Sequence, residues 1–170
     1  MKPRLGISAC LLGQCVRYDG GHKLDAALRD GMAESVEWVP VCPEAECGLG
    51  VPRPAMRLVG DPADPRLVTR ETGVDHTERM KAWVAKRLAE LEKEDLAGFV
   101  LKARSPSCGL CVKVLDAAGA EAGEAPGLFA RVFRDRFPDL SVSEDEALHG
   151  ASEREEFIRR VTGRPGARRR

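Results

Sequence analysis

The sequence has no net charge, no long apolar run and no cluster of histidines. Its 27 basic residues equal its 27 acidic residues, so no overall field favours a nucleic acid or a membrane surface as partner. No apolar run approaches the roughly 20 residues of a membrane helix, and no signal-peptide core follows the N-terminus. The histidines stand in unrelated contexts, which leaves no histidine-based metal site or triad. These absences predict a cytoplasmic protein without a membrane partner.

Six cysteines stand out against this background. In the reducing cytoplasm they indicate metal binding or catalysis rather than disulfides. Cys10, Cys42 and Cys108 each follow a short apolar run that is typical of a buried strand. The carboxyl ends of parallel strands lie at one edge of an open α/β sheet. We therefore expect the three thiols to converge on one point, as ligands of a metal with an open coordination position.

The remaining pattern predicts an α/β fold: a mostly parallel sheet with helices on both faces, a Rossmann-like three-layer arrangement. One domain is expected over residues 1–163, followed by a basic, solvated tail at 164–170. Residues 42–74 contain five prolines and four glycines and should be mostly loop with short strands. Strands are expected at 5–9, 36–41, 97–103 and 140–143, and helices at 23–31, from 75 past 91, at 127–137 and at 151–162.

The helix that begins near residue 75 has the clearest pattern. Asp75 is expected to be its N-cap, with Glu78 three positions later as in a capping box. One face carries apolar residues at helical spacing and should pack on the core. These residues are Met80, Trp83, Val84, Leu88 and Leu91.

The residues alone leave three further interpretations of the cysteines open. The first is a structural zinc ion or cluster in a module without catalysis. The second is a thiol redox protein, because Cys108-Gly-Leu-Cys111 is a C-x-x-C motif. The third is a set of ordinary buried thiols. The cysteines form three local pairs: Cys10 with Cys15, Cys42 with Cys47, and Cys108 with Cys111.

The chain also carries three motifs: Ser-Ala-Cys-Leu-Leu-Gly at 8–13, Cys-Pro-Glu at 42–44 and Ser-Pro-Ser-Cys-Gly at 105–109. Together with Arg-Tyr-Asp-Gly at 17–20 and Pro-Arg at 52–53, they resemble the bacterial thiouracil desulfidase family. The resemblance implies non-redox removal of sulfur from 2-thiouracil, 4-thiouracil or 4-thiouridine-like small molecules. The oxo compound and sulfide are the implied products.

The same resemblance implies a [4Fe–4S] cluster held by Cys10, Cys42 and Cys108. The fourth iron then has no protein ligand and binds the sulfur of the substrate. Glu44 and Ser105 match the implied catalytic residues. Cys47, which stands where glycine is usual, and Cys111 depart from the family pattern and add thiols near proposed ligands. The residues that we expect to bind substrate are Ser8, Arg17, Tyr18, Asp19, Arg53, Lys102 and Ser107.

Overall fold

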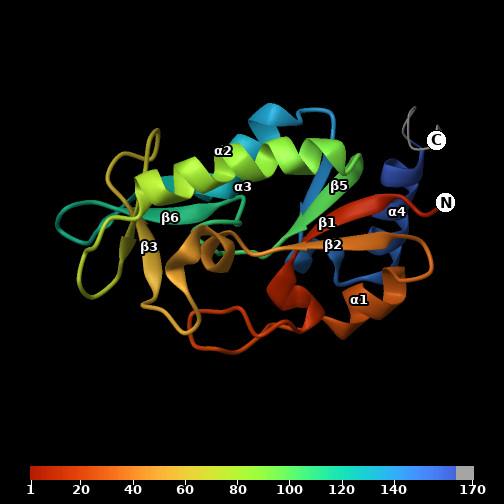
Figure 1. Ribbon diagram of the computed structural model, residues 1–170, viewed down its shortest axis with the longest axis horizontal. Helices are drawn as coiled ribbons and strands as arrows, with labels where there is room; N and C mark the ends of the chain where they lie inside the picture. The colour runs from red at the N-terminus through yellow and green to blue at the C-terminus, as the bar shows by residue number, and fades with distance from the viewer. Residues whose placement is uncertain (164–170) are drawn as a thin grey trace.

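The computed structural model describes residues 1–163, so the tail expected at 164–170 lies outside the described residues. Strands and helices alternate as the sequence predicts, with extra strand pairs after β2 and β5 (Figure 1). The strands are β1 (Arg4–Ser8), β2 (Glu37–Val41), β3 (Met56–Val59), β4 (Arg66–Thr69), β5 (Leu96–Leu101), β6 (Val112–Leu115), β7 (Glu121–Ala125) and β8 (Ser141–Glu144). The helices are α1 (Ala26–Met32), α2 (Thr77–Lys93), α3 (Leu128–Arg136) and α4 (Ala151–Thr162), with short turns η1 (Ala9–Leu12), η2 (Ala45–Leu49) and η3 (Asp145–Leu148).

The first sheet is entirely parallel, with the strand order β2-β1-β5-β8. All six residues of β5 are buried, as expected for a central strand that is covered on both faces. Helices α2 and α3 pack with one core cluster, and α1 and α4 pack with the other. The predicted α/β fold class, with a mostly parallel sheet between helices, is confirmed.

The register of this sheet aligns the ends of its strands. Ser8 lies opposite Val41 of β2, and Ile7 lies opposite Val100 of β5. In Figure 1 the carboxyl ends of β1, β2 and β5 point toward the second sheet. The three loops that carry Cys10, Cys42 and Cys108 therefore leave the sheet at one edge.

The second sheet is mixed and has the strand order β4-β3-β6-β7. The short strands β3 and β4 agree with the expectation for residues 42–74, whereas β6 and β7 lie outside the strands that the sequence predicts. Strand β7 consists of glutamate, alanine and glycine at an exposed edge, so it lacks the β-branched and aromatic residues that mark a strand. In its pairing partner β6, Val112 and Val114 alternate with polar Lys113, and this short alternation was the signal available in the sequence.

One continuous core joins the two sheets. Phe99 of β5 packs edge-to-face on Phe129 and Phe133 of α3, with ring centroids 5.4 and 4.9 Å away. A Cβ atom on Gly6 would lie 2.1 Å from the Phe99 ring, so the glycine makes room for it. Buried residues of β3, β4 and β6 belong to the same cluster. The expected core face of α2 is buried except for Trp83, which is partly exposed at its margin.

The start of α2 differs from the expectation. The N-cap residue is His76, and the Asp75 carboxylate accepts a hydrogen bond from the Thr77 N–H at 2.8 Å. The backbone of Asp75 bridges to Val68 of β4, which keeps Asp75 outside the helix. The Glu78 side chain is exposed, so the capping-box prediction is wrong. Among the described helices, none combines the length and the apolar character that crossing a bilayer requires.

The loop that carries Cys108 is held by the first turn of α3. The N–H groups of Phe129 and Ala130 both donate to the carbonyl of Ser107, at 3.0 and 3.2 Å. This contact is close because the N-cap residue is Gly127: a Cβ atom there would lie 2.4 Å from the carbonyl carbon of Ser107. The loop thus satisfies the free donors of a helix start, and the helix in turn fixes the loop.

We expect Gly127→Ala to destabilise the metal-free protein by about 1–3 kcal/mol more than Gly150→Ala, the usual range for overpacking. Gly150 is the matched control, because it is the N-cap of α4 and a Cβ there meets only the movable end of Glu153. Urea unfolding of both variants measures the difference. Equal losses would show that the Ser107 loop does not depend on close contact with α3.

Candidate functional site

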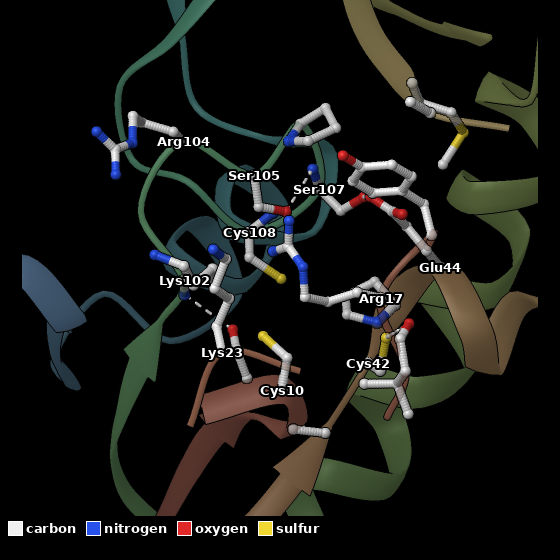
Figure 2. A pocket seen from close by; sticks show the side chains of 18 of the residues that line it. Cys10, Arg17, Lys23, Cys42, Glu44, Lys102, Arg104, Ser105, Ser107 and Cys108 are labelled. Carbon is white, nitrogen blue, oxygen red and sulfur yellow. Dashed lines mark hydrogen bonds between the residues drawn. The ribbon is translucent and has the colours of Figure 1, made fainter. Parts of the chain in front are cut away.

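A cavity of about 350 Å³ opens where the first sheet faces the second. Its lining includes Cys10 from η1, Cys42 after β2 and Cys108 after β5, and Figure 2 shows the three sulfur atoms around it. Cys10 and Cys108 are buried, and Cys42 is partly buried. The structure thus brings together the three cysteines that the strand pattern singled out. The volume falls in the range of small-molecule sites.

The three thiols share an environment that disfavours free thiolates. Burial, followed by the proximity of Cys42, raises the pKa of Cys10 to about 11. Burial also raises the pKa of Cys42, and it raises the pKa of Cys108 well above the usual range. Arg17 and Lys102 act in the opposite direction on the pKa of Cys10. Thiolates held this closely repel one another, and a bound cationic centre offsets that repulsion.

The arrangement differs from that of a structural zinc ion. Such an ion needs four ligands, with sulfur about 2.3 Å from one centre. Within residues 1–163, no three cysteine, histidine, aspartate or glutamate side chains lie close enough to hold a single metal ion. The thiols of the cavity surround a space and do not meet at one point. The structure therefore brings the three thiols to one cavity, as expected, but not to a single point.

The other three cysteines are not part of the cavity lining. Cys15 is exposed, and the Cys47 thiol donates to the carbonyl of Glu44 at 3.4 Å. The exposed Cys111 thiol donates to the Glu124 carboxylate at 2.7 Å, and its predicted redox partner Cys108 is a buried free thiol. The C-x-x-C motif therefore does not form a disulfide in this structure.

Glu44 is held by two partners at the cavity wall. Its Oε2 accepts a hydrogen bond from Arg53 Nε at 2.9 Å and lies 2.8 Å from Arg53 Nη2, while its Oε1 accepts from the Ser107 hydroxyl at 2.9 Å. The Glu44 side chain makes no capping hydrogen bond to η2. Both carboxylate oxygens are thus fixed beside the thiols.

Arg53 braces this carboxylate and two loops at once. Its side chain is 4% exposed, and Nη1 donates to the carbonyls of Val16 and Gly50, both at 2.9 Å. Most of the guanidinium donors are therefore used within the protein. The structure places Arg53 in the cavity lining, but mainly as the support of Glu44.

The three predicted serines lie in the lining with different partners. The Ser105 hydroxyl oxygen accepts the N–H groups of Ser107 and Cys108, at 3.3 and 3.1 Å. Because that oxygen acts as acceptor in both contacts, the hydroxyl proton is available to a ligand. Buried Ser8 accepts the Lys102 N–H at 2.9 Å, and its hydrogen bond to the Cys108 thiol partly offsets the effect of burial on the pKa of Cys108.

Cations dominate the charge of the lining. The sequence indicated three of them, and the structure adds three more. Of the added cations, Arg104 directly precedes the predicted residue Ser105, and Arg70 directly follows β4. The sequence therefore held a signal for each: the neighbouring motif for Arg104 and a position after a strand for Arg70. Glu44 is the acidic residue of the lining. The six cations are Arg17, Lys23, Arg53, Arg70, Lys102 and Arg104.

The first loop brings two of its three predicted residues, Arg17 and Tyr18, to the mouth of the cavity. Tyr18 lines the cavity, is 42% exposed and lies under the Arg17 guanidinium, 5.5 Å from the ring centroid. Asp19 is not part of the lining. Its carboxylate accepts the Gly21 N–H at 2.9 Å and stabilises the turn, so the structure does not bring it to a substrate.

Residues 5–145 match the family described as 2-thiouracil desulfurase. The chain belongs to this family. A solved structure of the [4Fe-4S]-dependent thiouracil desulfidase TudS has 29% sequence identity, a TM-score of 0.71, and an alignment that covers 86% of this chain and 93% of that one. The uncharacterized protein YbbK of Bacillus subtilis (strain 168) is 31% identical over 108 residues, which are 61% of this chain and 71% of YbbK. The resemblance drawn from the three motifs is confirmed.

For this desulfurase family member, we expect Arg53→Ala to lower the free energy of unfolding by about 3–5 kcal/mol, the usual cost of leaving a buried charge without its partner. Arg70→Ala is the control, because exposed Arg70 donates from Nε to one carbonyl, that of Met56. Surface changes of this kind usually alter stability by about 0.5 kcal/mol or less. The free energy of unfolding of both metal-free variants is measured in denaturant. Equal stability of the two variants would show that Arg53 does not stabilise the position of Glu44.

Proposed function

We propose that this protein removes sulfur from thiolated pyrimidines at a [4Fe–4S] cluster held by Cys10, Cys42 and Cys108. The observation that carries this proposal is that three cysteines and a fixed carboxylate, Glu44, face one cavity in a member of the desulfurase family. The structural relative TudS is named as [4Fe-4S]-dependent, which supports the cofactor. We assign the activity to a single domain of residues 1–163.

The residues present fit such a cluster. Cysteine thiolates are its usual ligands, and three of them leave one iron without a protein ligand. The Ser8 hydroxyl hydrogen-bonds to the Cys108 sulfur, and hydrogen bonds to ligand sulfurs stabilise the thiolate form. Cations of the lining offset the negative charge of the thiolates. A reducing cytoplasmic location suits six free cysteines.

When bound, the cluster supplies a Lewis-acidic iron that polarises the thiocarbonyl group. Glu44 then acts as general base: it accepts one proton from water as the water oxygen attacks the ring carbon, and it returns this proton to the sulfur as the carbon–sulfur bond breaks. The second proton of the water passes from the new hydroxyl group to the sulfur as the oxo group forms. Ser107 and Arg53 hold the two oxygens of Glu44 for this step. One water enters, and the oxo pyrimidine and hydrogen sulfide leave, without net oxidation or reduction.

The free hydroxyl proton of Ser105 is suited to hydrogen-bond the substrate or to relay a proton to it. Tyr18 and Arg17 at the mouth provide a ring face and planar N–H donors for a polar heterocycle. Six lining cations against one carboxylate favour a polar, partly anionic substrate over an apolar thiocarbonyl. We propose 2-thiouracil, 4-thiouracil and 4-thiouridine-type compounds as the substrate class.

The experiment that tests this function is anaerobic reconstitution with iron and sulfide, followed by a sulfide-release assay. We expect a brown protein that absorbs broadly near about 400 nm, as thiolate-bound clusters do. Sulfide should be released from at least one of 2-thiouracil, 4-thiouracil and 4-thiouridine. A protein that binds zinc or no metal, or that binds iron and releases no sulfide, would overturn the proposal in favour of a structural module.

We expect Cys10→Ser, Cys42→Ser or Cys108→Ser to prevent cluster assembly, because each removes one of three ligands. Cys15→Ser is the control, since Cys15 is exposed and outside the lining. Iron and sulfide contents after anaerobic reconstitution provide the measurement. A Cys10→Ser protein that binds as much iron as the wild type would show that the ligands are assigned incorrectly.

Glu44→Gln should keep the cluster and lose most turnover. The amide has nearly the same shape but does not act as a base, and general acid–base groups typically contribute about 100- to 10,000-fold. Exposed Glu78 on α2 supplies the control, and Glu78→Gln should turn over like the wild type. Rates are compared at equal iron content. A fully loaded Glu44→Gln enzyme with wild-type turnover would leave Glu44 with a purely structural role.

A further inference from the structure

A buried ion pair closes one side of the cavity. Lys102 Nζ lies 2.7 Å from Asp145 Oδ2, and the two side chains are 13% and 8% exposed. The second carboxylate oxygen, Oδ1, accepts the N–H of Ala103 at 2.7 Å. Both oxygens of Asp145 are thus used to hold one short segment, the two residues that follow β5. The ammonium has little freedom to move.

The pair has a defined orientation. Lys102 is part of the cavity lining and Asp145 is not, so the positive end faces the cavity and the negative end lies behind it. Figure 2 shows Lys102 on the side of the cavity where Cys10 and Cys108 lie. The backbone N–H of Lys102 donates to Ser8, whose hydroxyl hydrogen-bonds to the Cys108 thiol. The backbone of Lys102 is therefore linked to the thiol site through Ser8.

The two ends of the pair lie at different depths from the thiols. The cavity wall that contains Cys10 and Cys108 also contains Lys102, and it does not contain Asp145. The nearer, positive end of an oriented neutral pair outweighs the farther, negative end, so the pair acts on the sulfur atoms as a positive charge. Arg17 acts in the same direction, but its side chain is 23% exposed in a loop, with Asp19 3.9 Å away.

Stability alone does not explain such a pair. Removing two charges from water costs about as much as their attraction returns, so a well-packed apolar pair is often as stable. A site with three thiolate ligands, however, concentrates negative charge in a buried place. A fixed positive end directed at that site offsets the charge.

We propose that the Lys102–Asp145 pair is a fixed dipole that balances the negative charge of the cysteine-bound cluster, with Asp145 as a positioning residue that acts through Lys102. This inference rests on the proposed function, because it needs the cluster. Local charge is one of the factors that set the reduction potential of an iron–sulfur centre. A nearby cation stabilises the reduced, more negative state and raises that potential.

The decisive variant is Lys102→Gln/Asp145→Asn. A single replacement leaves a buried charge unpaired, whereas the double replacement keeps a hydrogen-bonding pair without charge. Lys102→Arg keeps the charge. Lys113→Gln/Glu121→Gln is the matched control, because it removes an ion pair of similar length, 2.8 Å, outside the cavity lining. Each protein is reconstituted anaerobically, and its iron content, melting temperature and midpoint reduction potential are measured, the last by a redox titration followed by absorbance and electron paramagnetic resonance.

We expect the Lys102→Gln/Asp145→Asn protein to have a lower midpoint potential than the wild type, with Lys102→Arg and the control close to the wild type. Loss of iron from the double variant at an unchanged melting temperature would be a stronger form of the same result. A fully loaded double variant with the wild-type potential would overturn the inference, and so would a Lys102→Arg protein that shifts as far as the double variant. Failure of the wild type to load iron would instead overturn the proposed function.

Discussion

The parallel pairing of β1 with β2 and β5 is the constraint on which the site depends. Parallel strands end on the same side of a sheet, and the aligned register brings residues 9–12, 42–44 and 102–108 to one edge. Cysteines that are 32 and 66 positions apart in the sequence thereby line one cavity. A slip of the register would separate them, because each loop starts where its strand stops.

The second sheet and its approach loops complete the site. Residues 50–53 lead into β3 and carry Arg53, which binds Glu44 and the carbonyl of Val16. Ser107 reaches the same glutamate from the loop after β5. The carboxylate thus joins the segment after β2, the approach to β3 and the loop after β5. The position of the Glu44 side chain therefore depends on tertiary contacts with loops that are attached to both sheets.

The sequence was sufficient for the parts that depend on local pattern. Apolar runs followed by cysteine located the ends of β1, β2 and β5, and helical spacing located α2. Strand β7 was missed because an edge strand of glutamate, alanine and glycine carries no apolar alternation. The local pattern predicts Asp75 as an N-cap, but the backbone of Asp75 bridges to β4 and stays outside the helix. The pattern of the helix segment alone does not indicate this bridge.

The same division applies to the candidate site. The three cysteines, Glu44 and the serines were found because each stands in a compact motif. Lys23 was not predicted because its place in the lining depends on how separate loops meet, whereas Arg70 directly follows a strand. Arg53 was expected at the substrate, but its partners are Glu44 and two carbonyls, and only the folded chain shows how many of its donors remain free.

The two buried ion pairs of the cavity are oriented differently. In the pair of Arg53 and Glu44, both partners line the cavity, so a carboxylate lies beside the thiols without adding net negative charge to them. In the pair of Lys102 and Asp145, the cation alone faces the cavity, so a neutral pair presents a positive end. A carboxylate without its arginine would repel thiolates, and a lysine without its aspartate would lack a fixed position. Pairing therefore allows a carboxylate and a positive charge to lie within one small cavity that also contains three thiols.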